Sequence, residues 1–338
     1  MATPISISDQ IFYFEPLIDW SKNRLKYISA WKLAFGRDGY EDRIDWLIGS
    51  PLNKTYVLRN EKGSVVAAYS LIRNQIVHLG SITESAICNN VFCIPKYQGL
   101  NLFVRISRLS LADSASNYTF AYGFPNPAAI AGHKRVGWQI LDDAFNISIK
   151  LLNIDKTYSS NVNHPLPVPI EQLSRDRQLE ICKQMADIAL IKSLSSKKIL
   201  SIAKSREYIY WRFFYRPKTE DRSYYVLGNA DVLMLFSVHH AKNEINILEF
   251  QTSDARNESD VLENLVHFAY CHNVRAIKLF GCAKSKLAKS IQMKFNIAEE
   301  DVHYEKVNMI VNSLEREQLN LEQSSLPCSM SFLDNDVY

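Results

Sequence analysis

Apolar residues in the first part of the chain follow helical spacing and then strand spacing. Residues 20–36 place them three to four positions apart, as in a helix, and Gly36 provides a stop. Residues 55–60 and 65–73 are strand-like runs joined by a Glu-Lys-Gly turn, which predicts a hairpin. The chain is therefore expected to begin with a helix followed by two paired strands.

A third extended run, 84–95, leads into another helix. Its Asn89-Asn90 pair fits a strand interior poorly and predicts a β-bulge, and Pro95 ends the strand. Residues 101–115 then place their apolar side chains on one stripe, which predicts a helix with one buried side.

A strand, a corner and a short helix are predicted next. The aromatic run 118–124 is typical of a buried strand, and the two prolines that flank Asn126 end it because proline has no backbone donor. Asn126 can cap the following helix, and Gly137 suits the left-handed position that ends it. A strand over 140–152 completes this half.

The second half repeats the alternation of helices and strands. Its helical or strand-like stretches are 176–194, 206–227, 232–238, 244–251, 259–273, 276–282, 284–295 and 304–313. Each half also has a tryptophan and a proline before its first hairpin, Trp46 with Pro51 and Trp211 with Pro217. The matching order of elements predicts a duplicated fold.

A proline-rich segment separates the halves. Pro165, Pro167 and Pro169 make it extended and stiff, which is typical of a boundary. We therefore predict an N-terminal domain over 1–158, a linker over 159–175 and a C-terminal domain over 176–338.

Composition excludes several classes of protein. The chain has 338 residues, of which 47% are hydrophobic, so it can bury a sizeable core. Its formal charge of +3, from 39 basic and 36 acidic residues, is too balanced to indicate nucleic acid as the main partner. No apolar run approaches the ~18 residues of a membrane span, and the first residues lack the basic character of a signal peptide.

The cysteines and histidines do not indicate a metal site. None of the cysteines forms a CxxC pair, so free thiols in a reducing cytoplasm are expected rather than a disulfide framework. These cysteines are Cys88, Cys93, Cys182, Cys271, Cys282 and Cys328. His239, His240 and His272 have no neighbouring residues at metal-ligand spacing.

Two motifs of the first half resemble those of a known superfamily. Residues 126–138 have the spacing N-x-x-A-I-x-x-(Y)-x-x-x-G-(F/W), and IPKYQGLNLF over 94–103 is similar to the pyrophosphate loop (Q/R)-x-x-G-x-(G/A). Together they resemble the GNAT superfamily, the Gcn5-related acyl-CoA N-acyltransferases. YGFPN, PKYQG and SFLDNDVY also look like segments of GNAT-like proteins associated with bacterial cell-surface polysaccharide genes. The resemblance is strongest over about 84–140, and in the second half it is one of topology only.

This resemblance implies a fold and a reaction. The fold would be a tandem α/β (α+β) arrangement of two mixed, twisted sheets flanked by helices. The reaction would be acyl transfer from acetyl-CoA or another acyl-CoA to a small-molecule amine. The similarity to polysaccharide-gene proteins makes an amino sugar, free or nucleotide-linked, the leading acceptor.

The superfamily also implies roles for particular residues. Its pyrophosphate lies on a helix N-terminus, its pantetheine between splayed strands, and a backbone N–H stabilises the oxyanion. The backbone at Cys93 and Ile94 would meet the thioester, and Asn126 would face the pantetheine. The implied pyrophosphate residues are Gln98, Gly99, Leu100, Asn101, Leu102 and Phe103.

The implied base and acid are Glu84 and His133. Both residues, and Asn126 as well, have a structural alternative. Glu84 would be a solvated strand end, His133 a packing residue and Asn126 a helix cap.

The sequence departs from the superfamily pattern at three positions. Asn101 and Phe103 stand where small residues are usual, and His133 stands where a tyrosine is usual. Asn101 can adopt the left-handed conformation, whereas Phe103 would either block the pyrophosphate or point into the core. The second half lacks an equivalent loop, so its copy is expected to have lost the cofactor site.

Two other classes of function stay open. Phe103 and the missing second loop favour a non-catalytic binding protein. An aminoacyl-tRNA-dependent transferase also pairs two GNAT-like domains, but it needs a basic surface and often a coiled-coil arm. The balanced charge and the absence of heptads count against it.

Overall fold

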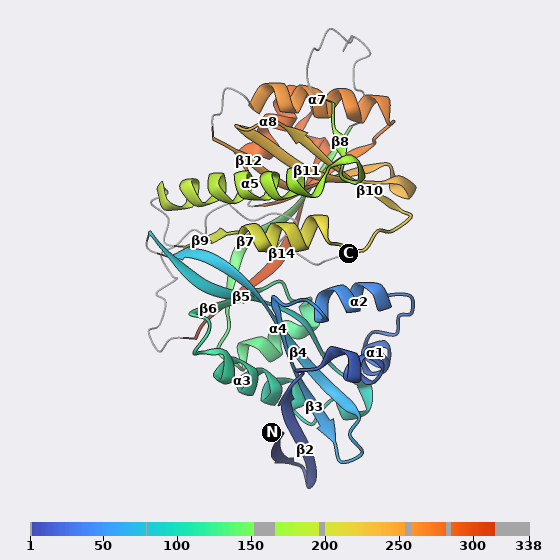
Figure 1. Ribbon diagram of the computed structural model, residues 1–338, viewed down its shortest axis with the longest axis vertical. Helices are drawn as coiled ribbons and strands as arrows, with labels where there is room; N and C mark the ends of the chain where they lie inside the picture. Colours follow the sequence, from blue (N-terminus) through green and yellow to red (C-terminus); the bar gives the residue numbers. More distant parts are fainter. Residues whose placement is uncertain are drawn as a thin grey trace. The chain divides into compact units, whose positions relative to one another are not determined.

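The computed structural model describes residues 2–78, 80–151, 166–195, 200–253, 258–281 and 285–314. Contacts divide the chain into two compact units. Unit 1 comprises Met1–Gln75, Thr83–Leu141 and the described chain from Asn308, and unit 2 comprises Ile76–Ile82 and Asp142–Val307. Figure 1 shows both units as mixed sheets flanked by helices. The predicted α/β class is confirmed.

The elements of the first part of the chain follow the predicted order, with an additional N-terminal hairpin and a second helix. They are β1 (Thr3–Ile7), β2 (Gln10–Pro16), α1 (Trp20–Phe35), α2 (Glu41–Ile48), β3 (Asn53–Asn60), β4 (Val65–His78), β5 (Ser81–Cys93), α3 (Leu102–Ser114), β6 (Phe120–Gly123), α4 (Pro127–Lys134) and β7 (Gln139–Lys150). Gly36 ends α1 with a φ of 63°, as its position predicts. Asn90 has a φ of 46°, which agrees with the irregularity expected in β5.

The elements of the second part include several that the sequence pattern does not assign. They are β8 (Val168–Pro169), α5 (Arg175–Ser195), β9 (Leu200–Ala203), α6 (Arg206–Ile209), β10 (Arg222–Gly228), β11 (Val232–His239), β12 (Glu244–Thr252), α7 (Glu258–Cys271), β13 (Ala276–Gly281), α8 (Lys286–Lys294) and β14 (Val302–Ser313). Among the described residues, no helix is both long enough and apolar enough to span a bilayer.

Unit 1 is built on a sheet with the strand order β1-β2-β3-β4-β5-β6-β14. Helices cover both faces of this sheet. Tyr56 and Thr55 are consecutive in β3 and so point to opposite faces. Tyr56 bonds Ser114 of α3, whereas Thr55 bonds Ser70, whose neighbour on that face is Tyr27 of α1. Helices α1 and α3 therefore bury opposite faces.

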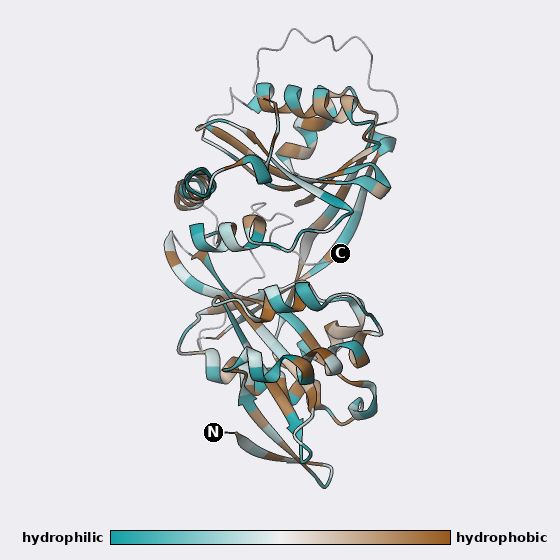
Figure 2. Ribbon diagram, turned by 45° about the vertical axis from the view of Figure 1, so that its right-hand side comes forward, coloured by the Kyte–Doolittle hydropathy of each residue, from teal (hydrophilic) through white to brown (hydrophobic). Residues whose placement is uncertain are grey.

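In unit 2 the strands follow the order β14-β7-β13-β12-β11-β10-β8. One face carries the hydrophobic core, where Ile147, Met234, Phe236, Ile247 and Leu279 pack on α7 and α8. In both units hydrophobic residues gather in the strands, and the outward sides of the helices are mainly hydrophilic (Figure 2). This is the pattern expected of helices that cover a sheet.

The boundaries of the units differ in position from the predicted domains. Residues 159–165 of the predicted linker lie outside the described residues, and Val168–Pro169 pair with β10 within unit 2. The later part of β7 pairs with β13 of unit 2, and the end of β14 pairs with β6 of unit 1. The residue composition of a segment does not predict which distant strand it pairs with, because backbone hydrogen bonds between strands depend little on side-chain identity.

Strand β14 is expected to contribute substantially to the stability of unit 1. Ile310 lies opposite Gly123 and is only 1% exposed. Ile310→Ala should lower the free energy of unfolding by about 2–5 kcal/mol, and Ile310→Val by about 0.5–1.5 kcal/mol, because the cost follows the buried volume removed. Urea denaturation measures both values. Equal and small effects would contradict this burial.

Candidate functional site

The candidate site begins where two parallel strands of unit 1 stop pairing. Strand β5 pairs with β6 from Ser85 opposite Phe120 to Cys88 opposite Gly123. After this point β5 continues to Cys93, whereas β6 ends at Gly123. The later residues of β5 therefore have an edge that β6 does not cover. Backbone N–H and C=O groups on such an edge can pair with an extended ligand.

Backbone geometry distinguishes Cys93 from Ile94 at this edge. The N–H of Ile94 donates to Val66 O of β4 at 3.0 Å, so it is used within the sheet. Because successive residues of a strand direct their backbone groups to opposite sides, the N–H and C=O of Cys93 point away from β4. The Gln98 amide donates to Cys93 O at 3.3 Å. Of the two residues predicted to meet a thioester, only Cys93 directs its N–H toward the uncovered edge.

The Cys93 thiol itself is not suited to nucleophilic chemistry. Burial raises its pKa to about 11. A thiol needs a lowered pKa to act as a thiolate near neutral pH. Cys93 is thus of interest for its backbone.

The predicted pyrophosphate loop leads from β5 into helix α3. Gly99 and Asn101 have φ values of 86° and 58°, so the left-handed conformation expected for Asn101 is present. Asn101 occupies the N-cap position but makes no side-chain capping bond. Leu100 and Leu102 flank it, and Leu102 is buried. The first N–H groups of α3 follow this turn without a side-chain cap, and such groups can receive an anion.

Arg135 brings a positive charge to this turn. Its guanidinium donates to Asn101 Oδ1 at 3.1 Å, and its carbonyl accepts from Arg108 Nη2 at 2.9 Å. The second contact ties the end of α4 to α3. The sequence offered Lys134 and Arg135 as a solvated face or as a contact of the CoA 3′-phosphate, and it did not connect Arg135 with the loop at Asn101.

Phe103 packs against α4, which decides between the two orientations considered for it. Its ring lies edge-on to the His133 ring, with 5.0 Å between centroids. Across from it, a Cβ atom at Gly132 would lie only 2.6 Å from a Phe103 ring carbon. The Phe103 ring thus occupies space that a side chain at position 132 would need, and glycine leaves that space open.

His133 contacts two aromatic rings. It is 3% exposed, and besides the Phe103 ring the Trp138 ring lies 5.2 Å from it, edge-on. Burial lowers its pKa to about 4. The imidazole is therefore neutral at pH 7 and holds few protons to donate. This environment fits the packing role that the sequence left open.

Glu84 lies far along β5 from Cys93. Nine residues of extended strand correspond to about 30 Å. Burial alone would raise its pKa, but hydrogen bonds from Arg73 at 2.7 Å and Gln75 at 2.9 Å produce a net lowering. A base must reach the proton that it removes, so this position does not suit a base acting near Cys93.

Asn126 acts as a helix cap. Its Oδ1 accepts from Ala129 N at 3.0 Å, with Pro127 at the first position of α4. The cap fixes where α4 begins, directly after β6. The corner predicted from the prolines is therefore built as expected.

Buried neutral groups line the sheet next to the edge. Burial raises the pKa of Tyr69 well above its ordinary value and that of Cys88 to about 12. The two side chains interact, and the Trp138 indole is close to the Tyr69 hydroxyl. These groups stay protonated at neutral pH, so they provide polarity without charge.

Comparisons of sequence and of structure gave different outcomes. No protein-family model matches the sequence, and no curated protein matches it. A GCN5-related N-acetyltransferase structure from Anabaena variabilis matches with a TM-score of 0.65 and 10% identity, covering 89% of this chain and 73% of that one. A GCN5-related N-acetyltransferase from Kribbella flavida has a TM-score of 0.63 and 11% identity, covering 88% and 70%.

A third structure is similar over the same extent. Eis1 from Mycobacterium abscessus matches with a TM-score of 0.59 and 12% identity, covering 90% of this chain and 74% of that one. At these identities the likeness establishes the fold. The chain thus has the fold of GCN5-related N-acetyltransferases.

The burial of His133 predicts a loss of stability in acid. Its pKa is about 4 in the folded state and about 6.5 when exposed, so between these values the unfolded state binds more protons. This linkage stabilises the fold above pH 6.5 and is lost as the pH falls toward 4. His133→Gln should remove about 2 kcal/mol of the difference in unfolding free energy between pH 7.5 and pH 5.

Urea denaturation at the two pH values measures this effect. His272→Gln is the matched control, because His272 is exposed. An acid sensitivity that is the same in wild type and His133→Gln would show that His133 is not held neutral by burial.

Proposed function

We propose that this protein is an acyl-CoA-dependent N-acyltransferase that acts on a small-molecule amine. The observation that carries the proposal is the turn of Gly99 and Asn101 before α3, with Arg135 bonded to Asn101 at 3.1 Å. It combines unpaired helix N–H groups with a fixed cation, beside the uncovered edge of β5. The fold shared with N-acetyltransferases supports the same function.

The pyrophosphate of the acyl-CoA would lie at the N-terminus of α3. The α3 dipole and the first N–H groups favour an anion there, and Arg135 adds a charge-assisted contact. Residues 98–103 would form this cradle, with Gln98 bonded to Cys93 O and Phe103 packed on α4. The departures at Asn101 and Phe103 are therefore compatible with the site.

The thioester carbonyl would lie at the edge of β5. There the Cys93 N–H, which points away from β4, would donate to the carbonyl oxygen as negative charge develops on it. A preorganised backbone donor of this kind stabilises the tetrahedral transition state. Asn126 would border the pantetheine through the corner that it caps.

Proton transfer is not assigned to Glu84 or His133 in this proposal. Glu84 is held by Arg73 and Gln75, and His133 is neutral and buried. The amine would lose its proton to solvent before attack. We retain an amino sugar of a surface-polysaccharide pathway as the proposed acceptor, on the sequence resemblance alone.

A non-catalytic acyl-CoA-binding protein is the second candidate. The Glu84 carboxylate is hydrogen-bonded to Arg73 and Gln75, and the pKa of His133 is lowered. Both observations favour this candidate, because they make Glu84 a poor catalytic base and His133 a poor catalytic acid. Release of free CoA thiol from acetyl-CoA in the presence of glucosamine separates the two candidates. Thiol release above the rate without protein indicates catalysis.

Arg135→Ala is expected to weaken acetyl-CoA binding by about 5- to 10-fold, or about 1–1.4 kcal/mol, because one charge-assisted contact is lost. Isothermal titration measures the change. Lys134→Ala is the matched control, since Lys134 is the exposed residue directly before Arg135 and should alter the affinity less than about 2-fold.

Two results would count against the proposal. A folded wild-type protein that binds neither acetyl-CoA nor longer acyl-CoAs would reject the acyl-CoA site altogether. Equal losses in Arg135→Ala and Lys134→Ala would reject the placement of the pyrophosphate at Asn101.

A further inference from the structure

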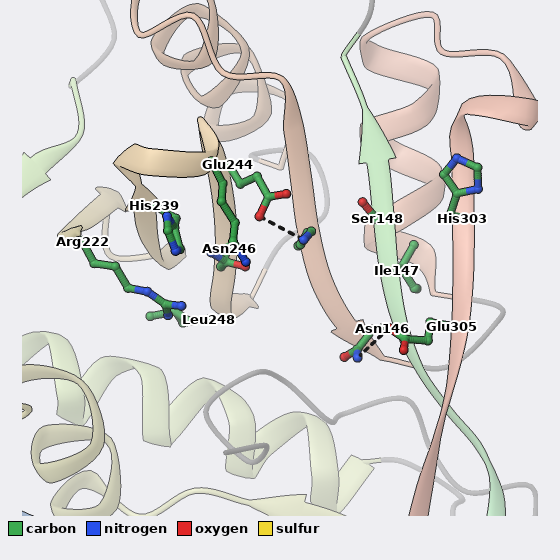
Figure 3. Close-up of a pocket in the computed structure, with 12 residues that line it drawn as sticks. Asn146, Ile147, Ser148, Arg222, His239, Glu244, Asn246, Leu248, His303 and Glu305 are labelled. Carbon is green, nitrogen blue, oxygen red and sulfur yellow. Dashed lines mark hydrogen bonds and ion pairs between the residues drawn. The ribbon is translucent and has the colours of Figure 1, made fainter. Parts of the chain in front are cut away.

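Unit 2 has a polar pocket on the face of its sheet opposite the hydrophobic core. Ile245, Ile247 and Ile277 belong to the core on α7 and α8. Because side chains alternate along a strand, Glu244, Asn246 and Lys278 lie on the other face. The pocket on this second face has a volume of about 360 Å³, and it is drawn in Figure 3. A volume of this size accommodates a small molecule.

Cross-strand pairing arranges the polar side chains in rows. Arg222 of β10 lies opposite His239 of β11, and His239 lies opposite Glu244 of β12. In the next row Ser237 lies opposite Asn246. Directly opposed residues of antiparallel strands have neighbouring side chains on one face. The pocket is thus built from sheet positions rather than from loops alone, and rigid elements hold such a site well.

Two side chains that line the pocket have buried polar atoms without a hydrogen-bond partner among the described residues. These atoms are His239 Nδ1 and Asn146 Oδ1. The Ser237 hydroxyl in the adjoining row is in the same condition. Buried polar groups in folded proteins are nearly always bonded. The atoms of the two lining residues are shielded from solvent, so a polar ligand would supply partners for them only after these side chains rotate.

Charge is distributed unevenly around the pocket. On one side the positive charges of Arg222 and Lys242 act on His239. Glu244 is paired with Lys278 at 2.9 Å, so these two charges offset each other. On the other side, Glu305 accepts from Asn146 Nδ2 at 3.4 Å (Figure 3). The pocket therefore has one side with Arg222, Lys242 and the nearby Asp221, and another side that offers a carboxylate and an amide.

We propose that this pocket binds a small polyhydroxylated molecule bearing one oxyanion, with the oxyanion on Arg222, Lys242 and His239. Guanidinium and ammonium groups bind carboxylates and phosphates through charge-assisted hydrogen bonds. Hydroxyl groups at the other end of the molecule would bond Glu305 and Asn146. The proposal concerns unit 2 alone and does not depend on acyl-CoA binding.

The electrostatic surroundings of His239 agree with an anion site. Burial lowers its pKa, and Arg222 and Lys242 lower it further, while Asp221 and Glu244 act in the opposite direction. A bound anion would offset the two cations and favour the imidazolium. Binding should therefore tighten as the pH falls from 7.5 to 6.

Glucose 6-phosphate and glucuronate are suitable probes, with glucose as the neutral control. Ligand-observed NMR with the full chain at low salt measures their dissociation constants. Both anionic sugars, or one of them, should bind at least about 10-fold more tightly than glucose, because glucose lacks the charged contact. Binding of glucose 6-phosphate alone would identify a phosphate ligand, and binding of glucuronate alone a carboxylate ligand.

Lys242→Ala should weaken binding of the anionic sugar by at least about 5-fold, whereas the matched control Lys289→Ala should leave it unchanged. Lys242 and Lys289 are both exposed, so neither substitution should prevent folding, and Lys289 lies on α8 at the other face of the sheet. His239→Gln is a second variant and should reduce the pH dependence measured with glucuronate, whose carboxylate stays ionised between pH 7.5 and 6. Failure of both sugars to bind below about 10 mM, or equal effects of Lys242→Ala and Lys289→Ala, would overturn the proposal.

Discussion

The end of the parallel pairing between β5 and β6 is the constraint on which the candidate site depends. The last pair joins Cys88 and Gly123, and a Cβ atom at Gly123 would lie 3.1 Å from Cys88 O. A glycine at this position therefore lets the strands approach closely just before they separate. Beyond it, β5 runs on to the loop before α3, and β6 turns into the capped start of α4. The uncovered strand edge and the α3 N-terminus thus follow from one local arrangement of the sheet.

The two units share an order of elements but differ beyond the end of their parallel strand pairs. In unit 2, strands β12 and β13 are parallel from Glu244 opposite Ala276 to Ile247 opposite Leu279, as β5 and β6 are in unit 1. Shortly after this point Glu249 forms an ion pair with Lys204 at 2.7 Å, and both side chains are almost fully buried. Loss of one partner of such a pair typically costs about 3–5 kcal/mol. This part of β12 is therefore fixed by an internal charge pair, whereas the part of β5 beyond its pairing with β6 leads to the turn that we propose as the pyrophosphate site.

Local features of the fold could be predicted from the sequence, and features set by distant contacts could not. The left-handed residues Gly36 and Asn101 and the cap at Asn126 depend on neighbouring residues, so residue type and spacing were sufficient. The pairing of β14 with β6, the fit of Phe103 against Gly132 and the bond from Arg135 to Asn101 join distant parts of the chain. The acid–base properties of the candidate residues could not be predicted for the same reason. Burial decides the pKa of His133, and the hydrogen-bond partners of Glu84 are on another strand.

The features that favour acyl-CoA binding are mainly backbone features. A helix N-terminus, two left-handed positions and an uncovered strand edge require a particular chain geometry, but they tolerate many side chains. Under the proposed function, this tolerance would account for Asn101 and Phe103 at positions where the superfamily pattern has small residues. It also agrees with a fold that matches N-acetyltransferase structures at 10–12% identity while no family model matches the sequence. Side-chain chemistry changes more readily than backbone geometry, so in the proposed reaction the acceptor and the route of its proton are the properties with most freedom to differ from one protein of this fold to another.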